Sequence, residues 1–285
     1  MTITQTCLIT GSTSGIGKAT AIQLAQKGWH VVIHGRKEPE CQKVKDEIIK
    51  ETGNKNVDYV VADLSLMKEV DRMAAEIRRR FPDLKVLVNN AGTFSMERTI
   101  TKEGVELTWA VNYLSRFLLV NRLLDLLKKN APARIVDVAG AYHAKGEIHF
   151  EDINLEKGYS FQTANSQSKL ANILFTYRLN QKLGGTGVSA NCLHPGFVNT
   201  GSILRVPGVS GFSRLMYKAM SIFSKSPEKG AATSVYLASS PEAAGASGKY
   251  FIDKKEAKSA PKTYDKTLQG KLWNFSVETI RKVLA

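Results

Sequence analysis

Residues 10–17 have the sequence Thr-Gly-Ser-Thr-Ser-Gly-Ile-Gly and stand between a short apolar run and a helical pattern. In this setting Gly11 allows a tight turn, Gly15 lets backbone N–H groups approach a pyrophosphate, and Gly17 permits close packing of the helix on the strand. The N-terminus of the helix then faces the phosphates. The stretch therefore predicts the first strand-to-helix turn of a dinucleotide-binding sheet. The alternative is a glycine-rich turn without a ligand.

Polar groups near this turn indicate which dinucleotide is bound. Ser12 and Ser14 add hydroxyl donors, and Ile16 opens the helix that faces the phosphates. The next strand ends in the sequence His-Gly-Arg-Lys, at the place where NAD-binding sites carry an acidic residue. Because Arg36 and Lys37 are cations, they favour the 2′-phosphate of NADP(H), which an arginine can bind through two hydrogen bonds. NAD(H) is the less favoured cofactor, and a solvated loop is the alternative role of the two cations.

Short apolar runs alternate with longer helical patterns along the chain, as in repeated βαβ units. Seven strands are expected, at residues 6–10, 30–34, 57–61, 86–89, 134–138, 188–193 and 249–252. Right-handed crossovers place helices on both faces and open a ligand crevice at the carboxyl ends of the strands. The predicted fold class is α/β, a Rossmann-type doubly wound, seven-stranded parallel sheet with helices on both faces. Residues 1–285 are expected to form a single domain.

The bulk composition narrows the function classes. The 285 residues are 43% hydrophobic and carry a formal net charge of +14, but acidic residues are mixed into the basic segments at 36–51 and 249–271. Because no basic stripe with interleaved aromatic residues is found, we expect no nucleic-acid partner. Three scattered cysteines predict neither a disulfide framework nor a metal site.

Membrane segments and export signals are not expected either. The N-terminus lacks a basic region followed by an apolar segment and a cleavage site. The most apolar stretch, residues 117–127, is interrupted by Asn121, Arg122 and Asp125 and predicts a half-buried helix. We therefore expect a cytoplasmic protein without an integral membrane segment.

Several motifs together resemble the short-chain dehydrogenase/reductase family. Besides the glycine turn, Asp63-Leu64 matches the family's adenine-contacting position, and residues 89–92 match its Asn-Asn-Ala-Gly signature. Pro195-Gly196 with Thr200 matches the stretch placed against the nicotinamide carboxamide. The resemblance adds to the expected cofactor site Asp63, Leu64, Asn90, Ala91, Gly92, Lys169, Pro195, Gly196 and Thr200.

Within this family the chain is similar to the retinol dehydrogenase-like branch. The similarity rests on Ser-Lys-Leu-Ala-Asn at residues 168–172, His-Pro-Gly at 194–196, and Leu272-Trp273. It spans almost the whole chain. Since the chain starts almost at its first strand, we expect it to lack the N-terminal anchor of the membrane-anchored members.

The resemblance also implies four catalytic positions, and two of them carry other side chains. The family uses Asn, Ser, Tyr and Lys to bind the substrate oxygen and to move a proton. Asn112 and Lys169 fall at the Asn and Lys positions. The Tyr position, four residues before the lysine, is Asn165, and the Ser position, in the turn after the fifth strand, is Gly140.

These substitutions predict weak or absent ordinary turnover. An amide has no proton to exchange near neutral pH, so Asn165 can hydrogen-bond a carbonyl but cannot act as the acid or base. Loss of acid–base help costs a factor of ~10² to 10⁴. Tyr142, His143, Tyr159 and His194 are possible replacements, with Tyr159 the first choice; packing or loop anchoring is their alternative role.

The region after the sixth strand is expected to control the substrate. Residues 201–226 combine turn-forming Pro and Gly with an apolar face, which predicts a substrate lid, the alternative being a surface helix. Residues 260–285 form a C-terminal extension. The expected partners are a small apolar substrate and, as an assembly, a homodimer or a tetramer.

Three hypotheses for the function follow. The first is an NADP(H)-dependent oxidoreductase acting on an apolar carbonyl or alcohol with the usual Ser/Tyr proton relay missing. The second is a catalytically impaired NADPH-binding sensor or scaffold. The third is a non-redox cyclase or isomerase using the same pocket, in which Asn165 orients the substrate.

Overall fold

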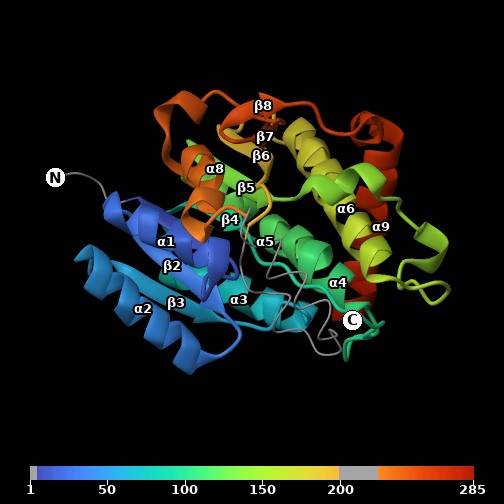
Figure 1. The fold of residues 1–285 in the computed structure, drawn as a ribbon, viewed down its shortest axis with the longest axis horizontal. Coiled ribbons are helices and arrows are strands. Elements are labelled where there is room, and N and C mark those ends of the chain that lie inside the picture. Colours follow the sequence, from blue (N-terminus) through green and yellow to red (C-terminus); the bar gives the residue numbers. More distant parts are fainter. Residues whose placement is uncertain (1–4, 199–223) are drawn as a thin grey trace.

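A central sheet of eight strands organises the described part of the chain, residues 5–198 and 224–285, in the computed structural model. The strand order is β3-β2-β1-β4-β5-β6-β7-β8, and the order reverses between β1 and β4 (Figure 1). The strands are β1 (Thr6–Ile9), β2 (His30–Gly35), β3 (Val57–Val61), β4 (Leu84–Asn89), β5 (Ala133–Val138), β6 (Val188–His194), β7 (Tyr250–Ile252) and β8 (Lys255–Ala257). The reversal is the topological switch point at which open α/β sheets bind ligands.

Helices connect the parallel strands. They are α1 (Gly15–Gln26), α2 (Glu38–Thr52), α3 (Met67–Arg80), α4 (Leu107–Trp109), α5 (Ser115–Lys129), α6 (Phe161–Lys182), α8 (Pro227–Ser239) and α9 (Lys266–Leu284). A π-helical turn, Ala110–Leu114, joins α4 to α5. Within the described residues, no helix is both long and apolar enough to span a membrane.

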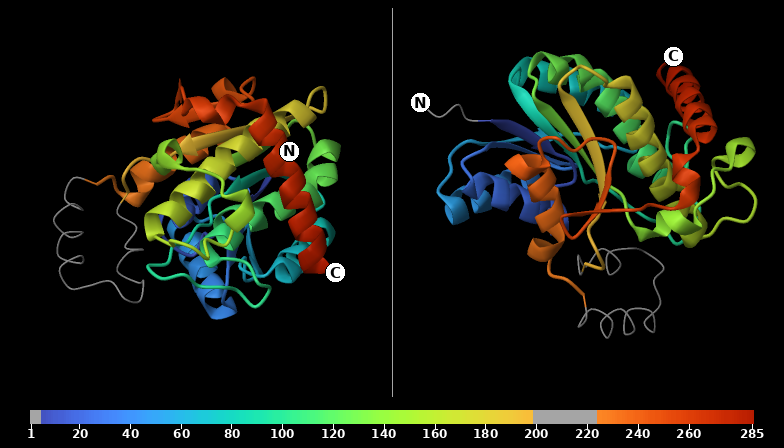
Figure 2. Two further views of the ribbon diagram at one scale, coloured as in Figure 1. Left: turned by 90° about the vertical axis from the view of Figure 1, so that its right-hand side faces the viewer. Right: turned by 90° about the horizontal axis from the view of Figure 1, so that it is seen from above.

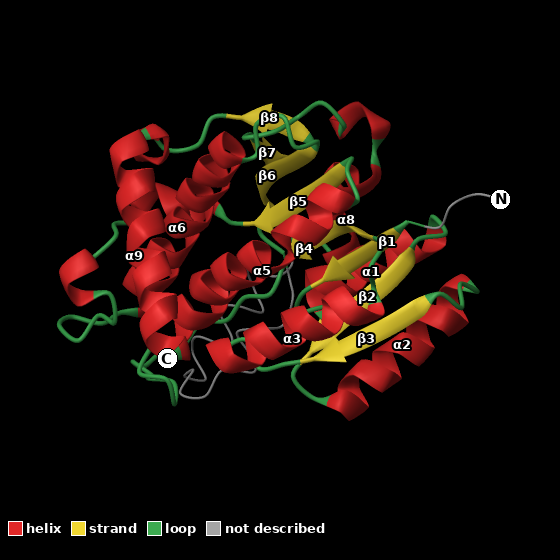
Figure 3. Ribbon diagram, turned by 180° about the vertical axis from the view of Figure 1, so that it is seen from behind, coloured by secondary structure: helices red, strands yellow, loops and turns green. Residues whose placement is uncertain are grey.

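Both faces of the sheet are covered, because successive side chains of a strand point to opposite faces. In β1, Leu8 joins a core cluster with residues of α3, α5, α6 and α9, whereas Cys7 and Ile9 join a second cluster with residues of α1, α2 and α8. Figure 3 shows the face that α3, α5, α6 and α9 cover. The two buried layers explain why the predicted strands are almost uniformly apolar.

The predicted fold class is confirmed, with one addition. The seven expected strands are all present and pair in parallel, but β8 adds an antiparallel eighth strand on β7. The prediction of a purely parallel, seven-stranded sheet missed it because Lys255-Glu256-Ala257 is only three residues long and has no β-branched or aromatic side chain. The strand follows directly from a tight turn at Asp253 and Lys254, both of which have positive φ.

The C-terminal helix α9 packs against the helices that carry the candidate site (Figure 2). The Trp273 ring stacks on Phe175 of α6 with centroids 5.9 Å apart and meets Phe117 of α5 edge-on at 5.0 Å. The hydroxyls of Tyr113 and Ser276 lie 2.6 Å apart in the buried interior. Residues 260–285 therefore contribute to the same apolar core as α5 and α6.

Truncation of a buried α9 side chain should destabilise the protein. Leu272 is 1% exposed and lies in the core shared with α5 and α6, so Leu272→Ala is expected to lower the free energy of unfolding by about 2–5 kcal/mol. Val277 is on the same helix but 48% exposed, so Val277→Ala is expected to change it by less than about 0.5 kcal/mol. Urea unfolding measures both, and equal small effects would show that α9 is not part of the cooperative core.

Candidate active site

The glycine turn between β1 and α1 adopts the geometry that its sequence predicts. Gly11 and Gly15 have positive φ, +62° and +55°. A Cβ on Gly11 would lie 2.8 Å from Cα of Ala91, and a Cβ on Gly17 would lie 2.4 Å from the carbonyl oxygen of Gly11. Side chains are thus excluded where the turn, the helix and the loop after β4 meet. The N-terminus of the twelve-residue helix α1 opens at this turn, as a pyrophosphate site requires.

The loop after β4 is tied to the same turn. The Thr10 hydroxyl accepts hydrogen bonds from the backbone N–H groups of Asn90 and Ala91, both at 3.0 Å. The Asn90 amide donates to the carbonyl oxygens of Thr10 and Gly11 at 2.9 and 3.1 Å. The residues predicted from the Asn-Asn-Ala-Gly motif therefore lie against the glycine turn, as a shared cofactor site requires.

Ser12 supports the turn from behind, which differs from its expected role as a phosphate donor. Its side chain is fully buried; the hydroxyl donates to the carbonyl of Ile9 at 2.8 Å and accepts from the N–H of His34 at 2.8 Å. The hydroxyl is thus engaged within the protein, because β2 runs beside the turn. Ser14 is the N-cap residue of α1 and has extended backbone.

His34 is a component of this site that the sequence analysis missed. Its Nδ1 accepts from the N–H of Gly11 at 3.0 Å, and its Nε2 lies 3.1 Å from the carbonyl of Ala62, to which it must donate. Burial lowers the pKa of His34 to about 4, so the ring is neutral at pH 7. The imidazole therefore links the glycine turn to the end of β3. The sequence signal that could have indicated this role was a histidine within an otherwise apolar strand; its contact with the glycine turn is visible only in the structure.

The predicted adenosine-side residues lie at the ends of β2 and β3. Arg36 and Lys37 are exposed directly after β2, and Lys37 lies 3.6 Å from Glu40 in an ion pair. Asp63 accepts from the N–H of Ser65 at 2.9 Å, and the Leu64 side chain is buried in the core, which leaves only its backbone for a ligand. This end of the site is thus bordered by two cations, and the end of β2 carries no carboxylate.

Asn112 fixes the position of the loop after β4. It lies in the π-helical turn, 1% exposed; its amide oxygen accepts from the N–H of Thr93 at 2.7 Å, and its amide nitrogen donates to the Thr93 carbonyl at 2.9 Å. The same nitrogen donates to the Ser168 hydroxyl at 3.1 Å. A π-helical turn at such a position is frequent at functional sites because it re-aims one side chain.

Lys169 lies between two of the predicted positions. A Cβ on Gly140 would lie 3.7 Å from its Cδ, and a Cβ on Gly92 would lie 3.9 Å from its Nζ and 3.5 Å from Oδ1 of Asn112. Asn165 lies one helical turn earlier on α6, so it shares a face with Lys169. The structure therefore brings Asn112, Gly140, Asn165 and Lys169 into one region at the carboxyl end of the sheet.

The electrostatic environment of Lys169 is unusual. Burial, together with the nearby guanidinium of Arg116, lowers the pKa of Lys169 to about 7. This value is far below the ordinary lysine value near 10.4. Lys169 is thus able to exchange a proton at neutral pH.

Two of the four residues expected as replacements for a catalytic tyrosine are held in loop contacts. Tyr159 donates its hydroxyl to the carbonyl of Ser95 at 2.9 Å, and burial and the charge of Glu106 raise its pKa. His143 lies with Nδ1 2.7 Å from the carbonyl of Gly140 and accepts at Nε2 from the N–H of Ala260 at 3.1 Å. Both contacts fit anchoring of the loops around the site.

The segment after β6 reaches the site beside α8. Gly196 has a φ of +87°, and a Cβ there would lie 3.0 Å from Cδ of Lys225, whose Nζ forms an ion pair with Asp253. Pro195 and Gly196 are partly buried. Thr200 and nearly all of the lid predicted at residues 201–226 lie outside the described residues.

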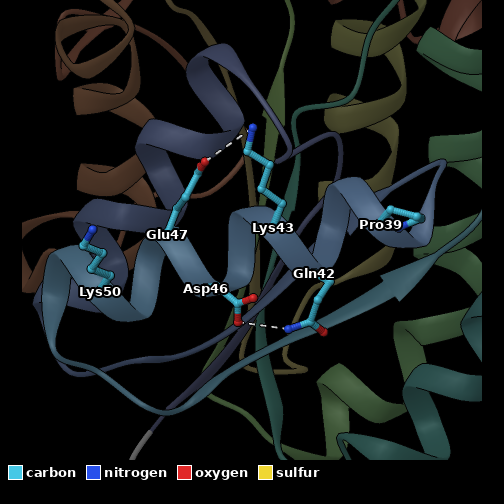
Figure 4. A pocket seen from close by; sticks show the side chains of 6 residues that line it. All are labelled: Pro39, Gln42, Lys43, Asp46, Glu47 and Lys50. Atoms are coloured by element: carbon cyan, nitrogen blue, oxygen red, sulfur yellow. Dashed lines mark hydrogen bonds and ion pairs between the residues drawn. The ribbon is translucent and has the colours of Figure 1, made fainter.

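A hollow on the outer face of α2 offers no chemistry comparable to that of the candidate site. It is open and is lined by Pro39, Gln42, Lys43, Asp46, Glu47 and Lys50 (Figure 4). Its polar side chains pair along the helix: Gln42 donates to Asp46 at 2.9 Å, and Lys43 lies 4.0 Å from Glu47. These i,i+4 pairs are typical of a solvated helix face.

The fold and the site together define a doubly wound α/β protein with a nucleotide-type turn at the switch point of its sheet and a lysine-bearing helix at the same edge. The family model described as short chain dehydrogenase matches residues 5–205. The chain belongs to the short-chain dehydrogenase/reductase family, whose members bind nicotinamide cofactors.

Curated relatives agree with this assignment, and a solved structure shares the fold. The chain is 41% identical to retinol dehydrogenase 14 of Mus musculus, over 95% of this chain and 84% of that protein. It is 38% identical to polyprenol dehydrogenase of Homo sapiens, over 95% of this chain and 83% of that protein. The crystal structure of L-sorbose reductase from Gluconobacter frateurii with NADPH and L-sorbose has the same fold, with a TM-score of 0.72 and 22% identity over 90% of this chain and 97% of that one.

The neutral state of His34 predicts an acid sensitivity of the cofactor turn. The folded-state pKa of about 4 lies below the unfolded value of 6.5, so the unfolded chain binds more protons between these values. The contribution of His34 to the free energy of unfolding is complete above pH 6.5. It decreases by about 3 kcal/mol as the pH falls to 4. In His34→Gln, the free energy of unfolding should fall less steeply over this range than in the unchanged protein. Measurement of both proteins at pH 8 gives the pH-independent cost of the substitution, and parallel pH curves would contradict the prediction.

Proposed function

We propose that the protein is an NADP(H)-dependent oxidoreductase acting on an apolar carbonyl or alcohol, with the usual Ser/Tyr proton relay missing. The observation that carries the proposal is the pairing of the glycine turn with Arg36 and Lys37, since a 2′-phosphate would be bound where NAD sites carry an acid. When bound, the nicotinamide supplies or accepts a hydride. Lys169 and Asn112 provide the polar groups at the reacting end.

An apolar substrate is supported by aromatic side chains around the reacting end. Phe94 lies in the loop after β4, Phe161 begins α6 one turn before Asn165, and Tyr142 lies two residues after Gly140. The Phe161 ring meets Phe94 edge-on at 5.1 Å and Tyr142 at 6.4 Å. Tyr142 remains 46% exposed. These rings form an apolar wall beside the predicted catalytic positions.

A second candidate function is a catalytically impaired NADPH-binding sensor or scaffold. It is favoured by Asn165, whose amide cannot transfer a proton, and by Gly140, which has no side chain. A non-redox cyclase or isomerase in the same pocket would also retain binding without net oxidation or reduction. Turnover with NADPH consumption separates the oxidoreductase from both.

The cofactor proposal is tested by removing the two cations after β2. Because charge-assisted hydrogen bonds contribute about 1.5–3 kcal/mol, Arg36→Ala with Lys37→Ala is expected to raise the Kd for NADPH by ~10- to 100-fold and to leave the Kd for NADH nearly unchanged. Lys43→Ala, an exposed lysine on α2, is the matched control and should change neither. Fluorescence titration gives both constants. Equal losses for the two cofactors, or no NADPH binding at millimolar concentration in the unchanged protein, would overturn the proposal.

Restoring the two missing side chains should increase turnover. A Cβ at Gly140 meets Lys169 only at ordinary contact distance, and Asn165 is partly exposed, so Gly140→Ser with Asn165→Tyr should be accommodated. The double variant is expected to reduce apolar aldehydes or ketones with NADPH ~10²- to 10⁴-fold faster than the unchanged protein. NADPH oxidation at 340 nm measures the rates. Equal rates would show that the unchanged protein has another efficient proton donor.

A further inference from the structure

A buried ion pair lies near enough to Lys169 for its cation to act on the lysine. Arg116 of α5 is 3% exposed, Asp137 of β5 is fully buried, and their nearest nitrogen and oxygen atoms are 3.6 Å apart. Asp137 also accepts hydrogen bonds from the Asn89 amide and the Thr176 hydroxyl, both at 2.9 Å. The carboxylate is therefore satisfied from three elements, as a buried charge requires.

Arg116 also holds the two backbone segments that border Lys169. Its Nη1 donates to the carbonyl of Val138 at 3.3 Å, and its Nη2 donates to the carbonyl of Ala91 at 3.5 Å. Val138 lies two residues before Gly140, and Ala91 lies one residue before Gly92, the two glycines closest to the lysine side chain. The guanidinium is thus fixed in place close to the lysine ammonium.

Three other polar side chains in this region are engaged within the protein, whereas the Nδ1 atom of His194 is buried without a hydrogen-bond partner in the described part of the chain. The Ser168 hydroxyl is buried, donating to the carbonyl of Asn165 and accepting from Asn112. Tyr159 donates to Ser95, and both ring nitrogens of His143 have backbone partners. Among the described residues of this region, Lys169 is a side chain that has an exchangeable proton and lies between Gly92 and Gly140.

The charges that face Lys169 favour loss of its proton. Arg116 repels a second cation, and Asp137, which pairs with the guanidinium, also accepts hydrogen bonds from Asn89 and Thr176. From β6, His194 faces the lysine; burial and the positive charge of Lys225 lower its pKa, and His143 lies beside it. The low pKa of Lys169 follows from this surrounding, with burial as its largest cause.

Resting on the proposed oxidoreductase function, we propose that Lys169 exchanges the proton with the substrate oxygen in place of the missing tyrosine, and that Arg116 is the positioning residue that holds it ready to do so. In reduction, the carbonyl carbon accepts the hydride supplied by bound NADPH, and the carbonyl oxygen takes a proton from the Lys169 ammonium. The products are the alcohol, NADP⁺ and a neutral amine at Lys169, which regains its proton from water. Oxidation runs the same transfers in reverse.

The proton state of Lys169 is measurable without turnover. In the full-length protein with isotope-labelled lysine, the NMR signal that disappears in Lys169→Met is expected to titrate near pH 7. In Arg116→Met with Asp137→Asn, where both charges are removed together, the titration should move up towards the ordinary lysine range. Arg122→Met with Asp71→Asn removes an exposed ion pair between α5 and α3 and should leave the titration in place. Titration of Lys169 above pH 9 in the unchanged protein overturns the role of Arg116, even if the buried double variant fails to fold.

The catalytic role is tested by the pH profile and by a charge-conserving variant. The kcat for reduction should fall as the pH rises through the Lys169 titration, and Lys169→Arg, which keeps the charge but not the exchangeable proton, should lose ~10²-fold or more while still binding NADPH. A histidine donor predicts instead that His194→Gln abolishes the pH dependence and Lys169→Arg does not, which overturns the proposal. Absence of turnover with NADPH bound overturns it as well and leaves the cofactor site standing. Absence of NADPH binding overturns the proposed function, and the NMR titration still decides the role of Arg116.

Discussion

The buried contact between Arg116 and Asp137 is the interaction on which the candidate site depends. It joins α5 to β5, and through Asn89, Thr176, Val138 and Ala91 it reaches β4, α6 and two site loops. Loss of one partner from a buried pair typically costs about 3–5 kcal/mol, because the remaining charge is uncompensated. The loops that carry Gly92 and Gly140 therefore share one electrostatic support. A disturbance at either charge is transmitted to both loops.

The sheet supplies the second constraint. Since parallel strands all end at the same edge, the segments after β1, β2, β4, β5 and β6 converge on the switch point between β1 and β4. The contacts there join side chains to backbone: the Thr10 hydroxyl accepts from the N–H groups of Asn90 and Ala91, and Gly11 and Gly17 exclude further side chains. The cofactor end of the site is thus a glycine turn held by side chain-to-backbone hydrogen bonds, and the reacting end consists mainly of side chains on α6 and the π-helical turn.

This division explains what could be predicted from the sequence. Buried parallel strands are continuous apolar runs, and glycine turns have fixed spacing, so the seven parallel strands and the turn at residues 10–17 follow from local pattern. The strand β8 did not, because its pairing depends on a turn and not on its own side chains. His34 and the pair of Arg116 with Asp137 were missed because their roles need contacts between distant segments. A charge of each sign inside an apolar helix and an apolar strand was nevertheless a usable signal, since buried charges must pair.

The surroundings of Lys169 disfavour its positive charge. Burial and the nearby guanidinium of Arg116 lower its pKa, so the folded chain holds the Lys169 proton less tightly than the unfolded chain does. Between pH 7 and the ordinary lysine range, the unfolded state then binds more protons, and the stability contributed by this group increases with pH. At neutral pH the fold therefore carries an unfavourable electrostatic term at its reacting end. Such terms persist where the surrounding structure fixes the group firmly, as the contacts of Arg116 with Val138 and Ala91 do here. The contacts that hold Arg116 beside Lys169 are thus the same ones that hold the loops of Gly92 and Gly140.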